Sequence, residues 1–324
     1  MVLGVSTSWA AGGVNHGRDL VERCKALDID GLELDYRLPP PLFRQVATAL
    51  KGSGLAVFSL HNFCPIPDSV PWDRVSAEPF LLSHPDREER LRAVRWTIRT
   101  LEHANDMGAR AVVLHCGRVG MDPQWDRLMV LWQTQGSHGE EFRTLMARKM
   151  EERRAAVRPH LDALLWSLDR LAREAERLHV FLGLENRAHY HELPGPDDYG
   201  TIFSALEGAP LGYWHDTGHA HLMEVFGWGD PMELLNTWKP VLLGMHLHDA
   251  QGADDHLPPG SGAIPFRRIL RAVRGAACPL IVEVKPGTTA RALRAGLDCL
   301  RDVLRTAATA EDDDGANQNS RFHP

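Results

Sequence analysis

The chain has 324 residues, of which 44% are hydrophobic and 24% are charged, and its formal net charge is −7. These values are typical of a globular protein with a large core, and the acidic balance argues against a general nucleic-acid-binding protein. Five cysteines without a CxxC pair argue against a disulfide framework and against a structural zinc site made of thiolates. The sequence shows no signal-peptide pattern and no apolar stretch of the roughly 18 residues that span a membrane, so we expect a cytoplasmic protein.

Eight short apolar segments are predicted strands, and helical segments lie between them. The strands are predicted at residues 2–7, 31–36, 55–62, 110–116, 180–186, 211–216, 242–249 and 280–285. Helical spacing marks residues 18–27, 41–51, 87–107, 197–206, 231–238, 266–273 and 290–307. Near-continuous runs of β-forming residues are typical of parallel strands that are covered on both faces. The pattern predicts an α/β fold, a closed (β/α)8 TIM barrel in one domain over residues 1–307. The alternative is a doubly wound open sheet, because strand number alone does not close a barrel.

The connection between the fourth and fifth predicted strands, residues 117–179, is enlarged. Residues 117–138 are predicted to be irregular and 140–157 to form a charged helix. Pro159 is expected to break or kink this helix, which resumes at 161–178. We expect its charged face to be solvated; a lid over the barrel mouth or a contact within a homo-oligomer are the alternatives. The polar tail, residues 308–324, is predicted to be disordered.

Six of the predicted strands end in a side chain that binds divalent metals, namely His61, His115, Glu185, Asp216, His246 and Glu283. In a TIM barrel these strand ends meet at one site. Further donors follow two of the strands, namely His219 three residues after Asp216, and the pair Asp254 and His256. Imidazole and carboxylate donors suit zinc, manganese, iron or cobalt. The sequence therefore predicts a divalent metal site at the barrel mouth.

Each candidate also has a purely structural interpretation. A single histidine at a strand end often makes only hydrogen bonds. A buried carboxylate is different, because it needs a cation nearby; for Glu185 and Glu283 that cation could be Arg187 or Lys285 instead of a metal. The convergence of the whole set favours a metal. Other polar residues near the strand ends are predicted to support the ligands or to lie at the surface, namely His189, His191, His215, His248 and Asp249, with Asp249 placed to hold a ligating imidazole.

These segments resemble the xylose isomerase-like superfamily of TIM barrels, which includes sugar isomerases and epimerases and the endonuclease IV enzymes. The resemblance covers residues 1–305 apart from the enlarged connection. It is carried by residues 59–62, 184–186, 215–219, 246–249, 255–262 and 282–283. The segments 215–219 and 246–249, in this order, are the most specific; the others are weak singly.

The sugar-acting branch implies one divalent ion, held by Glu185, Asp216, His246 and Glu283. The resemblance also implies that Glu185 and Glu283 transfer the proton in a metal-assisted reaction. We expect His219, Arg187 and His61 to contact the substrate, a small sugar or polyol derivative, with Arg187 suited to an anionic group. The first hypothesis is therefore a divalent-metal-dependent sugar isomerase or epimerase.

The endonuclease IV branch implies up to three zinc ions and more ligands. The chain has a candidate for each additional position, namely His61, His115, His219, Asp254 and His256. Such a site would activate water and stabilise the leaving oxygen of a phosphodiester, so a multinuclear zinc phosphodiesterase is the second hypothesis. The acidic balance and the lack of basic residues interleaved with aromatics make nucleic acid the less favoured partner. A third hypothesis is a vestigial metal site that binds a ligand without turnover.

Overall fold

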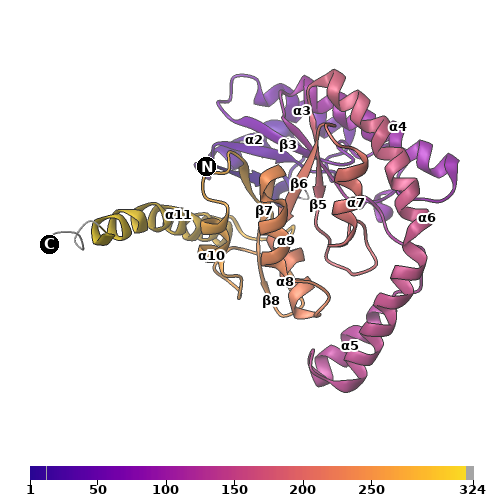
Figure 1. Cartoon of the computed structure of the whole chain (residues 1–324). Coiled ribbons are helices and arrows are strands. Elements are labelled where there is room, and N and C mark those ends of the chain that lie inside the picture. The colour runs from indigo at the N-terminus through magenta and orange to yellow at the C-terminus, as the bar shows by residue number, and fades with distance from the viewer. Residues whose placement is uncertain (12, 319–324) are drawn as a thin grey trace.

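The computed structural model describes residues 1–11 and 13–318, and these contain a closed barrel of eight parallel strands (Figure 1). Around the barrel the order is β1, β2, β3, β4, β5, β6, β7 and β10, and β10 pairs back to β1. The barrel strands are β1 Val2–Ser6, β2 Gly31–Leu34, β3 Ala56–His61, β4 Ala111–Leu114, β5 Phe181–Glu185, β6 Leu211–Asp216, β7 Leu242–Leu247 and β10 Pro279–Val282. The predicted TIM barrel is therefore confirmed, and the open sheet is wrong, because β1 pairs with both β2 and β10.

The barrel interior is filled from several strands around one indole. Trp214 on β6 is fully buried and packs in one cluster with Ala111, Val113 and Ile281. Its neighbour across the β6–β7 pair is Gly244. A Cβ atom at Gly244 would lie 2.3 Å from the Trp214 ring, so the indole occupies the space that a larger residue on β7 would need.

We expect Gly244→Ala to lower the free energy of unfolding by about 1–3 kcal/mol, because an added methyl group overpacks the core against the Trp214 ring. Chemical denaturation followed by circular dichroism measures the change. Gly200→Ala is the matched control, because a Cβ atom at Gly200 in a surface helix meets nothing within 4 Å; we expect that variant to be as stable as the parent or more stable by about 0.5–1 kcal/mol. Equal stability of Gly244→Ala and the parent would contradict this account of the barrel interior.

Helices surround the barrel, and local signals set where they begin and end. Asp86 accepts hydrogen bonds from the N–H groups of Glu88 and Glu89, which caps the long helix α4, and Asp230 caps α9 in the same way. Gly108, with a φ of 69°, follows the end of α4. The helices are α1 Ser8–Ala11, α2 Gly17–Lys25, α3 Pro40–Leu50, α4 Arg87–Asp106, α5 Trp125–Gln135, α6 Glu140–Leu178, α7 Asp198–Ala205, α8 Thr217–Val225, α9 Pro231–Trp238, α10 Phe266–Ala272 and α11 Ala290–Gln318, with short 3₁₀ turns η1 Trp72–Arg74 and η2 Lys239–Val241. Within the described chain, no helix has both the length and the apolar character needed to cross a membrane.

The enlarged connection differs from its prediction. α6 is one helix of 39 residues that continues through Pro159, so of the expected break or kink the break is wrong. Proline removes one helical hydrogen bond, but His160 beside it bonds to Gly120 N and Ser83 O, and buried leucines on both sides pack against the core. The segment predicted to be irregular also contains a helix, α5.

Two further segments depart from the sequence pattern. After β7, where a loop is expected, the chain forms an antiparallel hairpin of β8 Asp249–Gln251 and β9 Asp254–Leu257. At the C-terminus, α11 continues to Gln318, into the segment for which composition predicts disorder; residues 319–324 lie outside the described residues.

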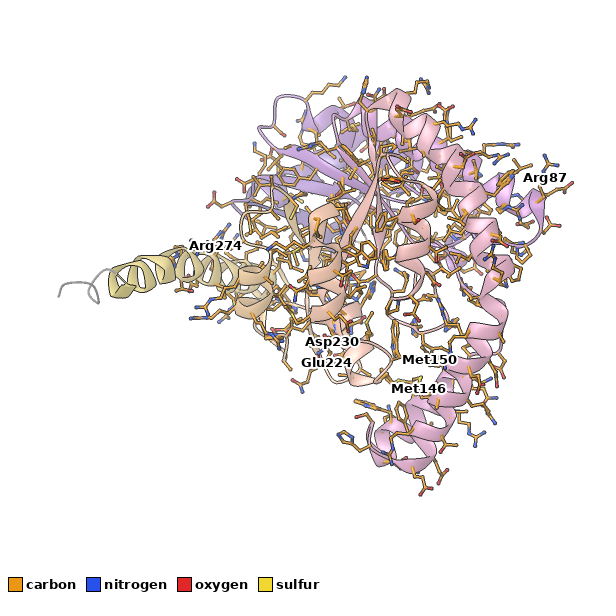
Figure 2. All side chains as sticks on the ribbon, in the orientation of Figure 1. Arg87, Met146, Met150, Glu224, Asp230 and Arg274 are labelled. Carbon is orange, nitrogen blue, oxygen red and sulfur yellow. The ribbon has the colours of Figure 1, made fainter. Side chains whose placement is uncertain are left out.

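The first half of α6 extends beyond the barrel together with α5 (Figure 1). Met146 and Met150 on this part of α6 lie across from the loop that carries Asp230 (Figure 2). Met150 and Asp230 line the same cavity of about 400 Å³. The enlarged connection therefore belongs to the flank of the barrel near α8 and α9.

Candidate metal centre

Four of the predicted ligands meet at the C-terminal ends of four neighbouring strands. Glu185, Asp216 and His246 lie on β5, β6 and β7, and Glu283 directly follows β10. His246 Nδ1 lies 2.8 Å from a carboxylate oxygen of Glu185, 3.2 Å from one of Glu283 and 3.7 Å from one of Asp216. All four side chains are buried, and one donor atom of each lies within 4.8 Å of the others. We call these four residues the central group.

A second group shares Glu185 with the central group. His61 at the end of β3 and His115 after β4 direct their Nε2 atoms at Glu185 Oε2, at 3.7 and 2.7 Å. The two imidazole rings lie edge to face, with centroids 4.8 Å apart. These two predicted histidines therefore form, with Glu185, a second set of donors on one side of the central group.

A third group shares Asp216 with the central group. It consists of Asp216, His219, His248 and His256. His248 Nε2 lies 2.9 Å from Asp216 Oδ2, and His219 Nδ1 lies 3.6 Å from Asp216 Oδ1. The sequence pattern placed His248 among supporting or surface residues, whereas the structure brings it into this group. The mouth of the barrel thus holds three contiguous donor sets joined by two shared carboxylates.

Local structure orients Asp216 towards both groups. β6 passes directly into α8, so Asp216 is the N-terminal cap of that helix and its Oδ1 accepts from His219 N at 2.7 Å. Asn186 holds the backbone on both sides, because it accepts from Asp216 N at 2.7 Å and donates to Asp216 O at 3.0 Å. With Oδ1 at the helix start, Oδ2 is left to face His246 and His248.

Glu33 on β2 contacts the central group, and the strand-end pattern missed it. Its carboxylate lies 3.0 Å from His246 Nε2, and it accepts a hydrogen bond from Ser59 Oγ at 2.8 Å. A carboxylate on one ring nitrogen fixes an imidazole so that the other nitrogen points at the metal. A signal was present in the sequence, because Glu33 is a carboxylate inside an apolar strand, as Glu185 is.

We expect Glu33→Gln to weaken divalent-metal binding about 10- to 100-fold, because the amide is a poorer partner for the His246 imidazole. Competition with a chromogenic chelator measures the dissociation constant directly. Glu22→Gln is the control, since Glu22 is an exposed residue of α2 that pairs with Lys25. Equal metal affinity in the Glu33 variant and the parent would show that Glu33 does not orient His246.

The predicted ligand Asp254 lies apart from these groups. Its carboxylate is 61% exposed and pairs with Lys285. Its neighbour Asp255 instead places Oδ2 3.2 Å from His256 Nδ1. Strand alternation would put Asp254 and His256 on one face, but His256 has a φ of 52°, which interrupts the extended backbone. Asp255 therefore takes the position beside the third group that the spacing assigned to Asp254.

Arg187 pairs with Glu185, as its structural interpretation expects, whereas Asp249 has partners other than the expected ones. The Arg187 guanidinium lies 3.1 Å from Glu185 Oε2 and 3.3 Å from Glu192 Oε1, and the side chain is buried. It therefore anchors Glu185 and is already engaged by protein carboxylates. Within the described residues, Asp249 accepts hydrogen bonds from the backbone N–H groups of Ala250, Gly260, Gly262 and Ile264, and it contacts no ligating imidazole.

Two of the other histidines predicted to support the ligands have partners of their own. His189 is partly exposed and bonds to Glu192, and His215 is buried beside the Tyr213 hydroxyl at 2.7 Å. Trp125 on α5 packs edge to face on His189, with centroids 4.3 Å apart, and a Cβ atom at Gly252 in the β8–β9 turn would lie 2.9 Å from the ring of Trp132, also on α5. Helix α5 therefore contacts both the segment after β5 and the hairpin, an arrangement that fits the alternative of a lid.

The charges of the site suit a divalent cation. Burial alone would lower the pKa of His246, but the charges of Glu33, Glu283 and Glu185 raise that pKa well above its ordinary value. Burial would also lower the pKa of His61. The hydrogen bond with Glu185 and the negative charge of Glu185 outweigh this effect and raise the pKa of His61 to about 9. The clustered carboxylates of the site thus need positive charge close to them to offset their mutual repulsion. Nitrogen and oxygen donors in this number fit zinc, manganese, iron or cobalt.

Comparisons with known proteins agree with this architecture. Solved structures with a similar fold include a D-tagatose 3-epimerase-like protein, at 19% identity and a TM-score of 0.69 over 95% of this chain and 98% of that chain. An L-ribulose 3-epimerase matches at 16% identity and a TM-score of 0.68 over 100% and 99%. A 3-keto-D-glucoside 4-epimerase from E. coli matches at 18% identity and a TM-score of 0.67 over 93% and 99%. At these identities the likeness shows the fold alone.

At the level of sequence, a search of the curated proteins gives no significant match. The model of one protein family, described as xylose isomerase-like TIM barrel, matches residues 21–303. This range runs from within α2 to within α11 and includes all the residues of the three donor groups. The chain belongs to the xylose isomerase-like TIM barrel family.

Proposed function

We propose that the chain is a divalent-metal-dependent isomerase or epimerase that acts on a small sugar or polyol derivative. The observation that carries the proposal is the central group, in which Glu185 and Glu283 approach the same atom of His246 at 2.8 and 3.2 Å. Two carboxylates around one cation site are what a proton transfer between two positions of a substrate requires. The epimerases among the similar folds support the same class of reaction.

The central group would hold the metal through Glu185, Asp216, His246 and Glu283. When bound there, a divalent metal polarises a carbonyl or hydroxyl oxygen and thereby acidifies the neighbouring C–H bond. The chain itself moves the proton. One of the two glutamates takes it from carbon, and the other returns a proton to the substrate.

The surroundings of Glu185 prepare it for this role. Its Oε2 is held by Arg187 at 3.1 Å and by His115 at 2.7 Å, so that Oε1 is presented to the centre beside His246. Burial and the nearby Arg187 lower the pKa of His115 to about 3, which keeps this imidazole neutral. Glu185 is therefore fixed in one orientation before a substrate arrives, which is how positioned groups gain catalytic efficiency.

The burial of the donor side chains favours a small substrate. The least buried side chains of the three groups are His256, His115 and His219, at 25%, 13% and 8% exposure. A substrate that passes these imidazoles to reach Glu185 and Glu283 must be small. A single sugar ring or open-chain sugar meets that condition, and His61 and His219, which lie beside Glu185, are the residues proposed to contact its hydroxyl groups.

Deuterium exchange tests the proposal directly. The metal-loaded protein is incubated in D₂O with a panel of keto-sugars, and proton NMR follows exchange at the carbons next to the carbonyl. We expect deuterium to enter one such position, together with a new sugar isomer, and neither change in chelated protein. The proposal fails if the metal-loaded protein exchanges no carbon-bound proton in any member of the panel.

The second and third donor groups favour one alternative, a multinuclear phosphodiesterase of the endonuclease IV type. Adjacent metal ions that share carboxylates can activate water and stabilise the leaving oxygen of a phosphodiester, and the two further groups share Glu185 and Asp216 with the central group. Cleavage of a duplex with an abasic site, together with two or three metal ions per chain by elemental analysis, would support this alternative. One ion per chain and an intact duplex would remove it.

A further inference from the structure

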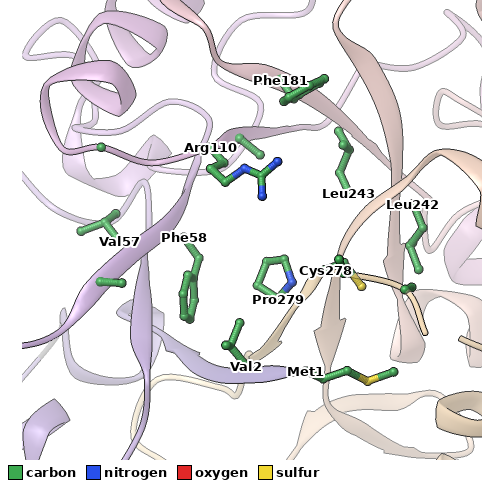
Figure 3. A pocket seen from close by; sticks show the side chains of 15 residues that line it. Met1, Val2, Val57, Phe58, Arg110, Phe181, Leu242, Leu243, Cys278 and Pro279 are labelled. Carbon is green, nitrogen blue, oxygen red and sulfur yellow. The ribbon is translucent and has the colours of Figure 1, made fainter. Parts of the chain in front are cut away.

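A second cavity lies at the opposite end of the barrel from the donor groups. Its volume is about 630 Å³. Residues at the beginning of six of the eight barrel strands line it, namely those of β1, β3, β4, β5, β7 and β10 (Figure 3). β4 shows the separation most simply, because Arg110 directly precedes it at this cavity and His115 directly follows it at the metal centre. We propose that this cavity binds a small amphipathic carboxylate, with the carboxylate on Arg110 and the hydrocarbon part against the strand ends.

The lining of the cavity is predominantly apolar and partly open to water. Met1, Val2 and Phe181 at its edge are 49%, 41% and 37% exposed. Deeper in the cavity, Phe58 and Leu243 pack against the buried cluster around Trp214 inside the barrel. The hydrogen-bonded barrel strands fix the wall, so the cavity is formed in advance. Cavities of about 300–1,000 Å³ with apolar walls and few polar groups are typical of small-molecule sites.

Arg110 is the charged side chain among the residues that line the cavity. Its backbone is held on both sides, because its N–H donates to Phe58 O at 3.2 Å and its carbonyl accepts from Phe181 N at 2.8 Å. The side chain extends across the cavity between Phe181 and Pro279 (Figure 3). Arg110 is an exposed residue, and in the part of the chain that the structure describes its guanidinium has no hydrogen-bond or ion-pair partner.

These features select the ligand class. A guanidinium binds a carboxylate through two parallel hydrogen bonds, and one such pair neutralises both charges. A phosphate group would carry more charge and would leave the apolar part of the lining uncovered. A straight hydrocarbon chain would cover Phe58 and Leu243 and remove the half-exposed edge residues from water. A medium-chain monocarboxylate therefore matches the apolar walls together with the positive charge of Arg110, to which the α-amino group of Met1 adds at the cavity edge.

Calorimetric titration of the full-length, metal-loaded protein with octanoate tests the proposal. Octanol offers the same chain without the charge, and acetate offers the charge without the chain. We expect saturable binding of octanoate, about tenfold or more weaker binding of octanol, and no competition by acetate. Arg110→Gln should weaken octanoate binding about 10- to 100-fold and leave octanol binding unchanged, since a bond to a charged group is lost.

Two further variants test whether the effect is specific to the cavity. Arg87→Gln is the matched control, because Arg87 begins α4 at the other end of the barrel, and we expect it to bind octanoate as the parent does. Ala277→Phe adds bulk at an exposed position of the cavity edge, and we expect it to weaken octanoate and octanol alike. Circular dichroism confirms that each variant is folded.

Three results would overturn the proposal. If the Arg110→Gln variant binds octanoate as tightly as the parent does, Arg110 is not part of the binding site. Octanoate binding that is lost when the metal is removed by a chelator would place the carboxylate at the metal centre instead. A dimer that dissociates on Arg110→Gln would show that this end of the barrel is a contact between two copies of the chain.

Discussion

Glu283→Gln is expected to lower kcat for sugar isomerisation about 10³-fold, and to stop deuterium exchange to the same extent. The amide keeps the shape of the carboxylate but cannot accept a proton, and general acid–base groups contribute about 10²–10⁴-fold to rate. The side chain lies 3.2 Å from His246 and is buried, so no solvent group can easily replace it. Proton NMR measures both the turnover and the exchange.

Metal content must be measured in the same samples, because Glu283 would also be a ligand. The amide retains one oxygen that can bind the ion, so partial occupancy is expected and the rate is expressed per bound metal. Glu224→Gln, at an exposed position on α8 (Figure 2), serves as the control with unchanged kcat. If the Glu283 variant has full activity per bound metal ion, Glu283 does not take part in proton transfer.

Removal of divalent metal is expected to abolish activity and to lower Tm by about 5 °C or more. Without a shared cation, the carboxylates of Glu185, Asp216 and Glu283 repel one another, and a ligand present at 100 times its Kd stabilises by about 2.7 kcal/mol. For a large domain each kcal/mol corresponds to about 2 °C. Thermal denaturation after chelation, and again after zinc, manganese or cobalt is restored, measures the shift.

The hairpin supplies a matched pair of variants for this experiment. Asp254→Asn should leave the recovery of Tm by metal unchanged, because Asp254 pairs with Lys285 at the surface. Asp255→Asn should reduce the recovery if the third group takes an ion, because Asp255 contacts His256. An identical Tm with and without chelator in the parent protein would count against resident metal in any of the three groups.

Much of the architecture was present in the sequence. Each of the eight barrel strands coincides with an apolar run, since parallel strands that are covered on both faces need apolar residues throughout. The same rule explains why carboxylates inside such runs, as at Glu185, are informative. The predictions that were wrong relied on local signals that packing overrides. At Pro159, for example, the contacts along α6 compensate for one lost hydrogen bond, and the helix does not break.

The sequence by itself determined that Glu185, Asp216, His246 and Glu283 would meet, because the ends of barrel strands converge whatever the loops do. Only the tertiary structure decided the partners of each donor. Asp255 takes the place of Asp254 because of the backbone at His256, and Arg187 faces protein carboxylates because Glu192 folds back beside it. The cavity at Arg110 likewise has no sequence signature, since it forms where strands far apart in the chain begin side by side. Spacing along a chain records periodicity, whereas the direction of a side chain depends on backbone angles and neighbours that spacing does not contain.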